Sequence, residues 1–256
     1  MSATPVLNPR PWLVSLKGLL FPPACLLCNC SMGLSEEAAV CARCRPHLPL
    51  RNQPACPLCG EFFERDGSCG GCANYPNGIG GEKNLAGEKN QGRDGLFFLY
   101  RYGRSARRLV HRMKITADPR AGVWLGSELR RLTQPPSGPF DAVIPVPSHR
   151  RQLLGSPANN GAAGLWADAL GSFFQIPVRS ALVRSKTVPK QTTLDRSRRL
   201  MASESSLAVR EPLLKGCRSV ILADDVMTTG ATANACTRAL KTAGVDRVTL
   251  AAVGRG

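Results

Sequence analysis

The chain has 256 residues, 43% of them hydrophobic, and its 34 Lys and Arg residues outnumber its 18 Asp and Glu residues to give a net charge of +16. This hydrophobic fraction supplies a packed core and excludes a disordered chain, and the length allows one large domain or two smaller ones. No apolar run reaches the roughly 18–20 residues that a membrane span needs. Residues 96–256 carry 25 basic and 10 acidic residues, against 9 and 8 in residues 1–95. The positive charge therefore lies almost wholly in the C-terminal part.

The N-terminal segment is the first candidate element. Residues 11–22 have the pattern of a short amphipathic helix that ends at Pro22 and Pro23. The apolar stretch within it is short, contains Lys17 and lacks a cleavage site of small residues, so we expect no signal peptide and a cytoplasmic location.

Cysteines are concentrated in the next segment. Nine of the eleven lie between residues 25 and 72, and eight of these form four Cys-x-x-Cys pairs. The pairs are Cys25 with Cys28, Cys41 with Cys44, Cys56 with Cys59, and Cys69 with Cys72. Two such pairs close a tetrahedral site of four thiolates, with Zn–S bonds of about 2.3 Å, so four pairs predict two structural Zn2+ ions.

Two alternatives to this zinc interpretation concern the same cysteines. A disulfide framework would need an oxidising compartment, which the expected location disfavours. Pairing in chain order is the simplest arrangement of the two sites, although spacing alone leaves crossed pairing open. Cys30 is predicted to be a bystander thiol. Closed four-thiolate sites leave no position for a catalytic water, so we expect a structural or interaction module over residues 1–75.

The composition changes after the last cysteine pair. Residues 76–95 are rich in Gly, Lys, Glu and Asn and contain the sequence GEKN twice, which indicates a flexible linker. Residues 96–256 then alternate apolar strand-like runs with helical patterns, which predicts an α/β domain with a central parallel sheet. The expected strands are 96–102, 141–146, 178–183, 219–223 and 248–253, and the expected helices are 104–114, 121–132, 161–173 and 231–243.

The most informative run is residues 220–232, VILADDVMTTGAT. An apolar strand leads into Asp224 and Asp225, then into a turn rich in Gly and Thr, then into a helix. Backbone N–H groups at a helix N-terminus bind anions, and Gly230 lets the backbone approach a phosphate closely. The two carboxylates suit sugar hydroxyls or a divalent metal. The alternative is that they only cap the following helix.

This run resembles the PRPP-binding motif of type I phosphoribosyltransferases. Together with the cysteine pairs, it makes the whole chain resemble the ComF family of bacterial competence-associated proteins. Other agreeing segments are YGRSARRLVHRMK at residues 102–114, VIPVP at 143–147 with the basic residues that follow, and residues 186–199. The resemblance implies a double zinc ribbon followed by a phosphoribosyltransferase-like domain.

The resemblance also implies roles for individual residues. Asp224 and Asp225 would hold the ribose hydroxyls of PRPP, bound with Mg2+, and the turn would cradle the 5′-phosphate. The implied turn residues are Met227, Thr228, Thr229, Gly230, Ala231 and Thr232. Candidates for the pyrophosphate side and its closing loop are Ser148, His149, Arg150, Arg151, Lys114 and Lys186.

Two functional hypotheses follow from these features. The first is an enzyme that transfers the phosphoribosyl group to a nitrogen acceptor and releases pyrophosphate. The second is a non-catalytic protein that senses PRPP or serves as a scaffold, binding single-stranded DNA and DNA-uptake proteins through its basic surface. Leu154 stands where the ComF family usually carries an arginine, so the pyrophosphate side departs from the family pattern while the turn agrees with it.

Overall fold

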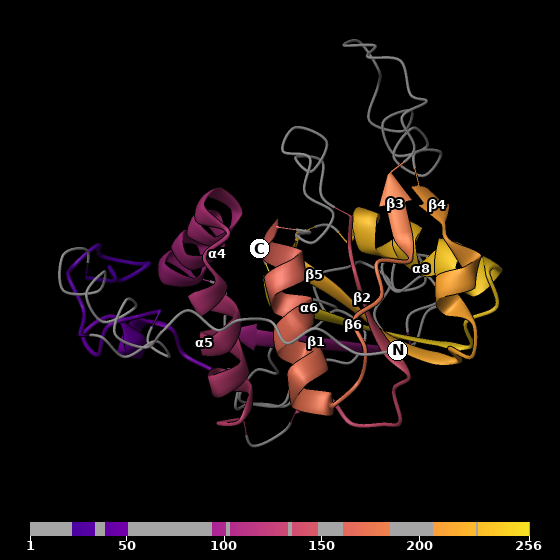
Figure 1. Ribbon diagram of the computed structural model, residues 1–256, viewed down its shortest axis with the longest axis horizontal. Helices are drawn as coiled ribbons and strands as arrows, with labels where there is room; N and C mark the ends of the chain where they lie inside the picture. Colours follow the sequence, from indigo (N-terminus) through magenta and orange to yellow (C-terminus); the bar gives the residue numbers. More distant parts are fainter. Residues whose placement is uncertain are drawn as a thin grey trace, which may run out of the picture.

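The computed structural model describes residues 22–33, 39–50, 94–100, 103–132, 135–147, 161–184, 207–228 and 230–255 (Figure 1). The helix predicted at residues 11–22 and the linker predicted at residues 76–95 lie almost entirely outside the described residues. The domain boundary predicted after residue 75 lies outside them as well. So do the third and fourth cysteine pairs, which consist of Cys56, Cys59, Cys69 and Cys72.

Four strands form the central sheet in the order β1-β6-β5-β2, and every neighbouring pair is parallel. They are β1 (Gly95–Tyr100), β2 (Ala142–Pro145), β5 (Ser219–Met227) and β6 (Arg247–Arg255). Val220 of β5 pairs with Ala142 of β2 on one side and with Val248 of β6 on the other. A parallel sheet is covered on both faces, so its strands are continuous apolar runs. The predicted α/β fold with a parallel sheet is confirmed.

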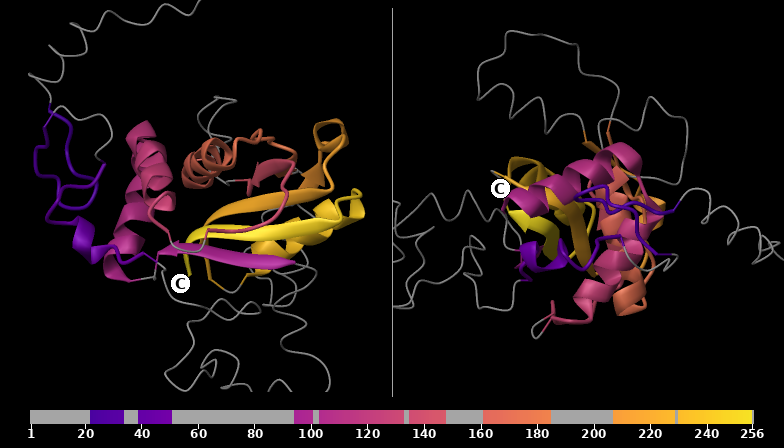
Figure 2. Two further views of the ribbon diagram at one scale, coloured as in Figure 1. Left: turned by 90° about the horizontal axis from the view of Figure 1, so that it is seen from below. Right: turned by 90° about the vertical axis from the view of Figure 1, so that its left-hand side faces the viewer.

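Helices cover both faces of this sheet, as Figure 2 shows in its left view. They are α4 (Arg104–Thr116), α5 (Pro119–Leu129), α6 (Gly161–Phe174) and α8 (Ala231–Thr242). Alternate residues of a strand point to opposite faces. Ile221 and Ala223 of β5 therefore belong to the buried cluster under α4, α5 and α6, whereas Val220 and Leu222 belong to the cluster with α8. None of the helices in the described part of the chain is long and apolar enough to cross a membrane.

The strand predicted at residues 178–183 differs from the observed structure. Val178 makes one parallel bridge to Val143 at the edge of β2, and a turn closed by the hydrogen bond from Ala181 N to Arg179 O then leads the chain away. Only β3 (Leu182–Arg184) follows, and it pairs antiparallel with β4 (Leu207–Val209) in a separate small sheet. The strand β4 and the short 3-10 helix η3 (Glu211–Leu214) were not predicted.

The first half of the cysteine-rich segment packs on the outer side of α4 and α5 (Figure 2). It contains the 3-10 helix η1 (Arg45–His47). Leu26, Val40 and Leu48 belong to the same buried cluster as Leu109 of α4 and Trp124 of α5. This half of the ribbon is therefore joined to the α/β domain by a shared hydrophobic core.

Polar contacts reinforce the same junction. Arg112 Nη2 donates a hydrogen bond to Asn29 Oδ1 at 2.7 Å. Arg45 Nη2 lies 2.6 Å from Oε1 of the fully buried Glu128, and the Arg45 guanidinium stacks 5.0 Å from the Trp124 ring centroid. Such contacts fix the orientation of the cysteine loops on the helices.

Candidate functional site

Asp224 and Asp225 lie inside β5, near the carboxyl end of the sheet. The predicted strand ended at Ala223, but β5 continues to Met227 because β6 remains beside it, pairing Asp224 with Ala252 and Met227 with Arg255. Ligands of open α/β sheets bind in the crevice outside the carboxyl ends of the strands. The structure thus places both carboxylates where such a ligand would sit, on a rigid strand instead of a turn.

The turn after β5 leads directly into α8. Gly230 has φ 80° and ψ 1°, a left-handed conformation that glycine adopts without steric cost. No side chain caps α8 at Gly230, and Ala231 begins the helix, with Thr232 in its first turn. The positive end of the α8 dipole therefore faces the same edge of the sheet as the two carboxylates.

Lys114 comes to this edge from α4. Its Nζ lies 2.8 Å from Asp225 Oδ1, and the Lys114 side chain is 47% exposed against 17% for Asp225. The sequence predicted Lys114 as a candidate on the pyrophosphate side, and the structure brings it instead to one of the two carboxylates.

Burial raises the pKa of Asp224 to about 7, with a further contribution from the negative charge of Asp225. The Asp225 backbone N–H, which donates to Asp224 Oδ1 at 2.8 Å, and the positive charges of Lys114 and Arg184 oppose this increase in pKa. Arg184 is held at the site by a hydrogen bond of 3.1 Å from its Nε to Pro147 O, at the end of β2. Asp224 therefore changes its protonation state near neutral pH.

Several predicted residues cannot be placed at this edge. Thr229, Ser148, His149, Arg150, Arg151 and Lys186 lie outside the described residues. The site that the structure describes therefore consists of Asp224, Asp225, Met227, Thr228, Gly230, Ala231, Thr232 and Lys114.

A groove beside this edge was not predicted from the sequence. It has a volume of about 750 Å³ and runs between α4 and the end of β5. Its lining residues are Arg104, Arg107, Arg108, Val110, His111, Lys114, Val226 and Thr228. The basic residues of 104–114 recur at helical spacing in the sequence, but the groove also depends on the distant residues Val226 and Thr228.

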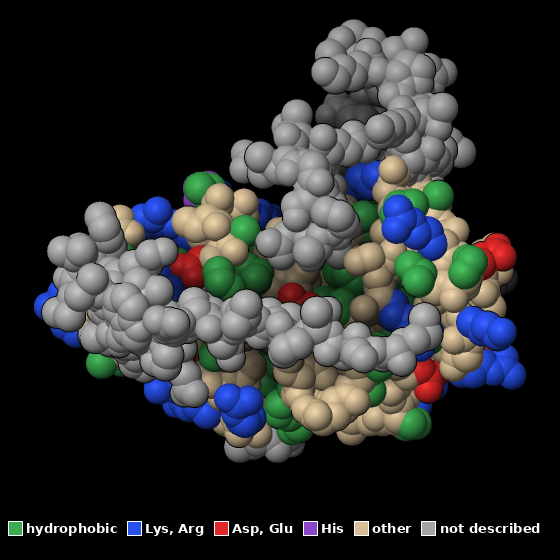
Figure 3. Space-filling model, in the orientation of Figure 1, with side chains coloured by type: hydrophobic (Ala, Val, Ile, Leu, Met, Phe, Trp, Pro, Cys, Tyr) green, Lys and Arg blue, Asp and Glu red, His purple; other side chains and the backbone are tan. Residues whose placement is uncertain are grey.

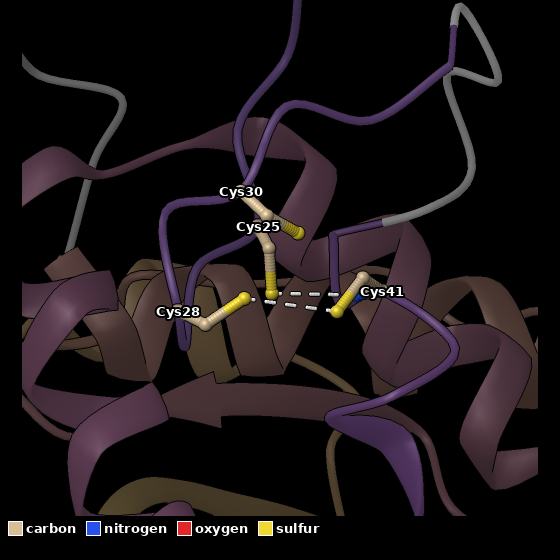
Figure 4. Close-up of side chains that lie close together, drawn as sticks. All are labelled: Cys25, Cys28, Cys30 and Cys41. Carbon is tan, nitrogen blue, oxygen red and sulfur yellow. Dashed lines mark hydrogen bonds between the residues drawn. The ribbon is translucent and has the colours of Figure 1, made fainter.

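Three cysteines of the first two pairs form a cluster with Cys30 on the outer side of α4 and α5. The Sγ atoms of Cys25, Cys28, Cys30 and Cys41 all lie within 4.8 Å of one another (Figure 4). Cys28 Sγ and Cys41 Sγ are 3.7 Å apart. Four convergent thiols are the donor set that zinc prefers in structural sites, so these residues fit a Zn2+ ion.

Local backbone geometry explains the convergence. Asn29 has a left-handed φ of 61°, which turns the chain just after Cys28. The Cys25 sulfur accepts hydrogen bonds from Leu27 N at 3.4 Å and from Cys41 N at 3.3 Å. Burial raises the pKa of the Cys25 thiol, but these and other hydrogen bonds outweigh it and lower the pKa overall. The loop is thus arranged to hold thiolate.

Cys30 was predicted to be a bystander, yet it lies inside the cluster. Cys44, the predicted fourth ligand, also lies close to its neighbours: burial raises the pKa of its thiol to about 12, and contacts with the Cys28 and Cys41 thiols add to the increase. Four sulfurs thus form the cluster, and the Cys44 thiol lies beside two of them. The sequence spacing favoured Cys44, and only the fold brings Cys30 alongside.

The second zinc site predicted from the sequence has no counterpart among the described residues. Its four predicted ligands, which all lie outside the part of the chain that the structure describes, are Cys56, Cys59, Cys69 and Cys72. Their assignment to zinc therefore stays a prediction from the Cys-x-x-Cys spacing, and the geometry described above applies to the first site alone.

Comparison with known protein families supports the N-terminal assignment. Residues 16–73 match the family described as the double zinc ribbon domain. No curated protein matches the chain. The match and the cysteine cluster together show an N-terminal zinc ribbon that uses cysteine ligands.

Proposed function

We propose that the α/β domain binds PRPP together with Mg2+ at the carboxyl edge of its sheet, as a phosphoribosyltransferase-like domain of the ComF kind. The observation that carries the proposal is the placement of Asp224 and Asp225 at the end of the central strand β5, directly before the left-handed Gly230 and the N-terminus of α8. In this position, carboxylates can accept hydrogen bonds from two adjacent ribose hydroxyls while the helix end receives a 5′-phosphate.

Different residues of the chain would contact different parts of PRPP. Asp225 would exchange its ion pair with Lys114 for a sugar hydroxyl, and Asp224 would accept the second hydroxyl more strongly once ionised. Lys114 would then be free to face a ligand phosphate. Mg2+ would neutralise part of the pyrophosphate charge. The loop after β2, with Ser148, His149, Arg150 and Arg151, and the segment containing Lys186 would take the pyrophosphate.

The reaction that such a site supports is transfer of the phosphoribosyl group. A nitrogen of the acceptor forms a bond to C1 of the ribose while the bond from C1 to the pyrophosphate oxygen breaks. The bonding electron pair leaves with pyrophosphate, and the proton of the acceptor nitrogen passes to water. The protein contributes position and charge complementarity and needs no nucleophile of its own.

A second candidate function is a non-catalytic PRPP sensor or scaffold that binds single-stranded DNA and DNA-uptake proteins in competence, inside the cytoplasm. It is favoured by the 25 basic and 10 acidic residues of 96–256 and by Leu154 in place of the arginine of the ComF pattern. A polyanion that neutralises many of these charges would bind with a steep dependence on salt.

One pair of assays tests the proposal and separates the two candidates. Calorimetric titration of the full chain with PRPP and Mg2+ should give saturable binding, and its absence would refute the proposal. Incubation with PRPP, Mg2+ and free bases should then release pyrophosphate if the chain is a transferase. Saturable binding without release from any base would instead support the sensor.

A further inference from the structure

The groove between α4 and the end of β5 opens directly beside the proposed sugar site. Lys114 lines the groove and contacts Asp225, while Val226 and Thr228 form its wall on the β5 side. Its volume of about 750 Å³ lies within the range of small-molecule sites, roughly 300–1,000 Å³. A ligand in the groove would therefore lie next to a sugar held by β5.

The α4 wall of the groove is rich in basic residues. Arg104, Arg108, His111 and Lys114 follow one another at intervals of three or four residues and so share one face of the helix, and Arg107 lines the groove beside Arg108. In the part of the chain that the structure describes, Lys114 is the one member of this set in an ion pair. Figure 3 shows separate Lys and Arg side chains at the upper edge of the molecule near α4.

This arrangement opposes the stability of the helix itself. Three arginines occupy the first five residues of α4, where the helix dipole disfavours positive charge, and the first turn has no acidic residue. Like charges three or four residues apart destabilise a helix by a few tenths of a kcal/mol per pair, about 0.2–0.5. Arg112, on the same helix but facing the ribbon, is by contrast hydrogen-bonded to Asn29. Local rules are broken in this way chiefly at functional sites.

The groove shares Lys114 and Thr228 with the proposed PRPP site, whereas Arg104, Arg107, Arg108 and His111 lie further along α4 and have no assigned role in PRPP binding. α4 contacts β6, which flanks β5 on one side, whereas β2 flanks β5 on the other side. The 5′-phosphate is assigned to the turn before α8. The cations of α4 therefore remain available for a second anionic molecule.

We propose that the α4 groove binds the phosphate group of the second substrate, so that the acceptor of this chain is a phosphorylated molecule. The inference rests on the proposed function, because it uses the sugar site on β5 as its reference. Several cations that converge from one helix face suit a phosphate ester better than a neutral base. An uncharged acceptor would not need the basic residues that line this groove.

The test uses phenyl phosphate as the probe, added to the full chain already saturated with PRPP and Mg2+. Binding is followed by the imidazole C–H resonances of His111, identified by their loss in the His111→Gln variant. We compare the wild type with the double variant Arg107→Ala/Arg108→Ala. The control Arg130→Ala/Lys215→Ala removes the same charge from exposed positions outside the groove. Alanine favours helix, so the α4 variant is expected to fold.

We expect the probe to bind about tenfold more weakly to the α4 variant than to the wild type, on the basis of roughly 0.2–1 kcal/mol for each exposed charge contact. The control should bind it normally, and PRPP affinity should be unchanged in both variants. Equal probe affinity in all three proteins would refute the inference while leaving PRPP binding intact. A loss of PRPP affinity in the α4 variant would assign the groove to pyrophosphate, which also refutes it. The inference would also be refuted if phenyl phosphate did not bind while an oligothymidylate bound in a way that required Arg107 and Arg108.

Discussion

Lys114 Nζ lies 2.8 Å from Asp225 Oδ1 and thereby joins helix α4 to the carboxyl end of β5. The two residues are 111 positions apart in the sequence, and each lies at the edge of a different proposed site. Lys114 lines the α4 groove, and Asp225 belongs to the sugar site. The positive charge of Lys114 therefore links the groove to the ionisation of Asp224.

This coupling predicts the pH dependence of PRPP binding. Ionised Asp224 accepts hydroxyl hydrogen bonds better than its protonated form, so affinity should rise as pH increases through the Asp224 pKa of about 7. The positive charge of Lys114 opposes the increase in that pKa. The Lys114→Met variant should therefore show its rise in affinity at a higher pH. Calorimetry between pH 6 and 9 measures both midpoints.

A matched control for this prediction is Lys241→Met. Lys241 is also in an ion pair, with Asp94 at 2.7 Å, and it lies in the last turn of α8, at the opposite end of that helix from Gly230. Its removal should leave the midpoint where it is in the wild type. If Lys114→Met and Lys241→Met shift the midpoint equally, the Lys114–Asp225 contact does not control the site.

The raised pKa of Asp224 also predicts how the stability of the protein depends on pH. Because the pKa of Asp224 is raised in the folded state from an ordinary value of 3.8, the folded chain holds a proton that the unfolded chain releases between pH 4 and 7. Its contribution to stability is fully present below pH 4 and is lost as pH rises through about 7. Asp224→Asn removes this loss, so it should stabilise the protein more at pH 8 than at pH 5. Urea unfolding at the two pH values checks this, and an equal effect at both would contradict it.

The four clustered sulfurs and the neighbouring Cys44 thiol predict an unequal dependence of zinc binding on the individual cysteines. The full reduced chain should contain about two Zn2+ ions, and Cys25→Ser should lose one of them because Cys25 is central to the cluster. Cys30→Ser and Cys44→Ser should each retain more zinc than Cys25→Ser, since either residue can replace the other as fourth ligand. Metal analysis after dialysis against a chelator measures this. Cys217→Ser, outside the cluster, is the control.

The junction between ribbon and α/β domain predicts a specific loss of stability. Arg45→Ala removes the 2.6 Å contact with Glu128 and the stacking on Trp124, and leaves the buried carboxylate with Arg131 as its remaining partner. We expect a loss of about 1–3 kcal/mol in the free energy of unfolding. Arg43→Ala, an exposed arginine two residues away, should change it by less than about 0.5 kcal/mol. Urea unfolding of both variants measures this difference. A similar change in the free energy of unfolding for the two variants would contradict the assigned role of Arg45.

The sequence predicted the parts of the fold that depend on local periodicity. The apolar runs at residues 219–223 and 248–253 indicated buried parallel strands, and the amphipathic spacing of residues 104–114 indicated α4. Strand length could not be predicted in the same way. Asp224 and Asp225 are poor strand formers, and only the backbone of β6 beside them extends β5 to Met227.

The candidate sites show the same distinction between local pattern and spatial placement. The run at residues 220–232 and the Cys-x-x-Cys spacing pointed to their chemistry without a structure. The contact of Lys114 with Asp225, the inclusion of Cys30 in the thiol cluster and the groove beside α4 depend on elements that are far apart in the sequence. No periodicity within one segment encodes them.

The most direct test of the account is the affinity of the chain for PRPP with Mg2+ after the change Asp224→Asn/Asp225→Asn, measured by calorimetry at pH 8 beside the wild type and the control Asp246→Asn. The double variant loses two charged hydrogen-bond acceptors, each worth about 1.5–3 kcal/mol, so we predict at least a hundredfold weaker binding, with the control unchanged. Equal affinity of the wild type and the double variant would show that the end of β5 does not hold the sugar.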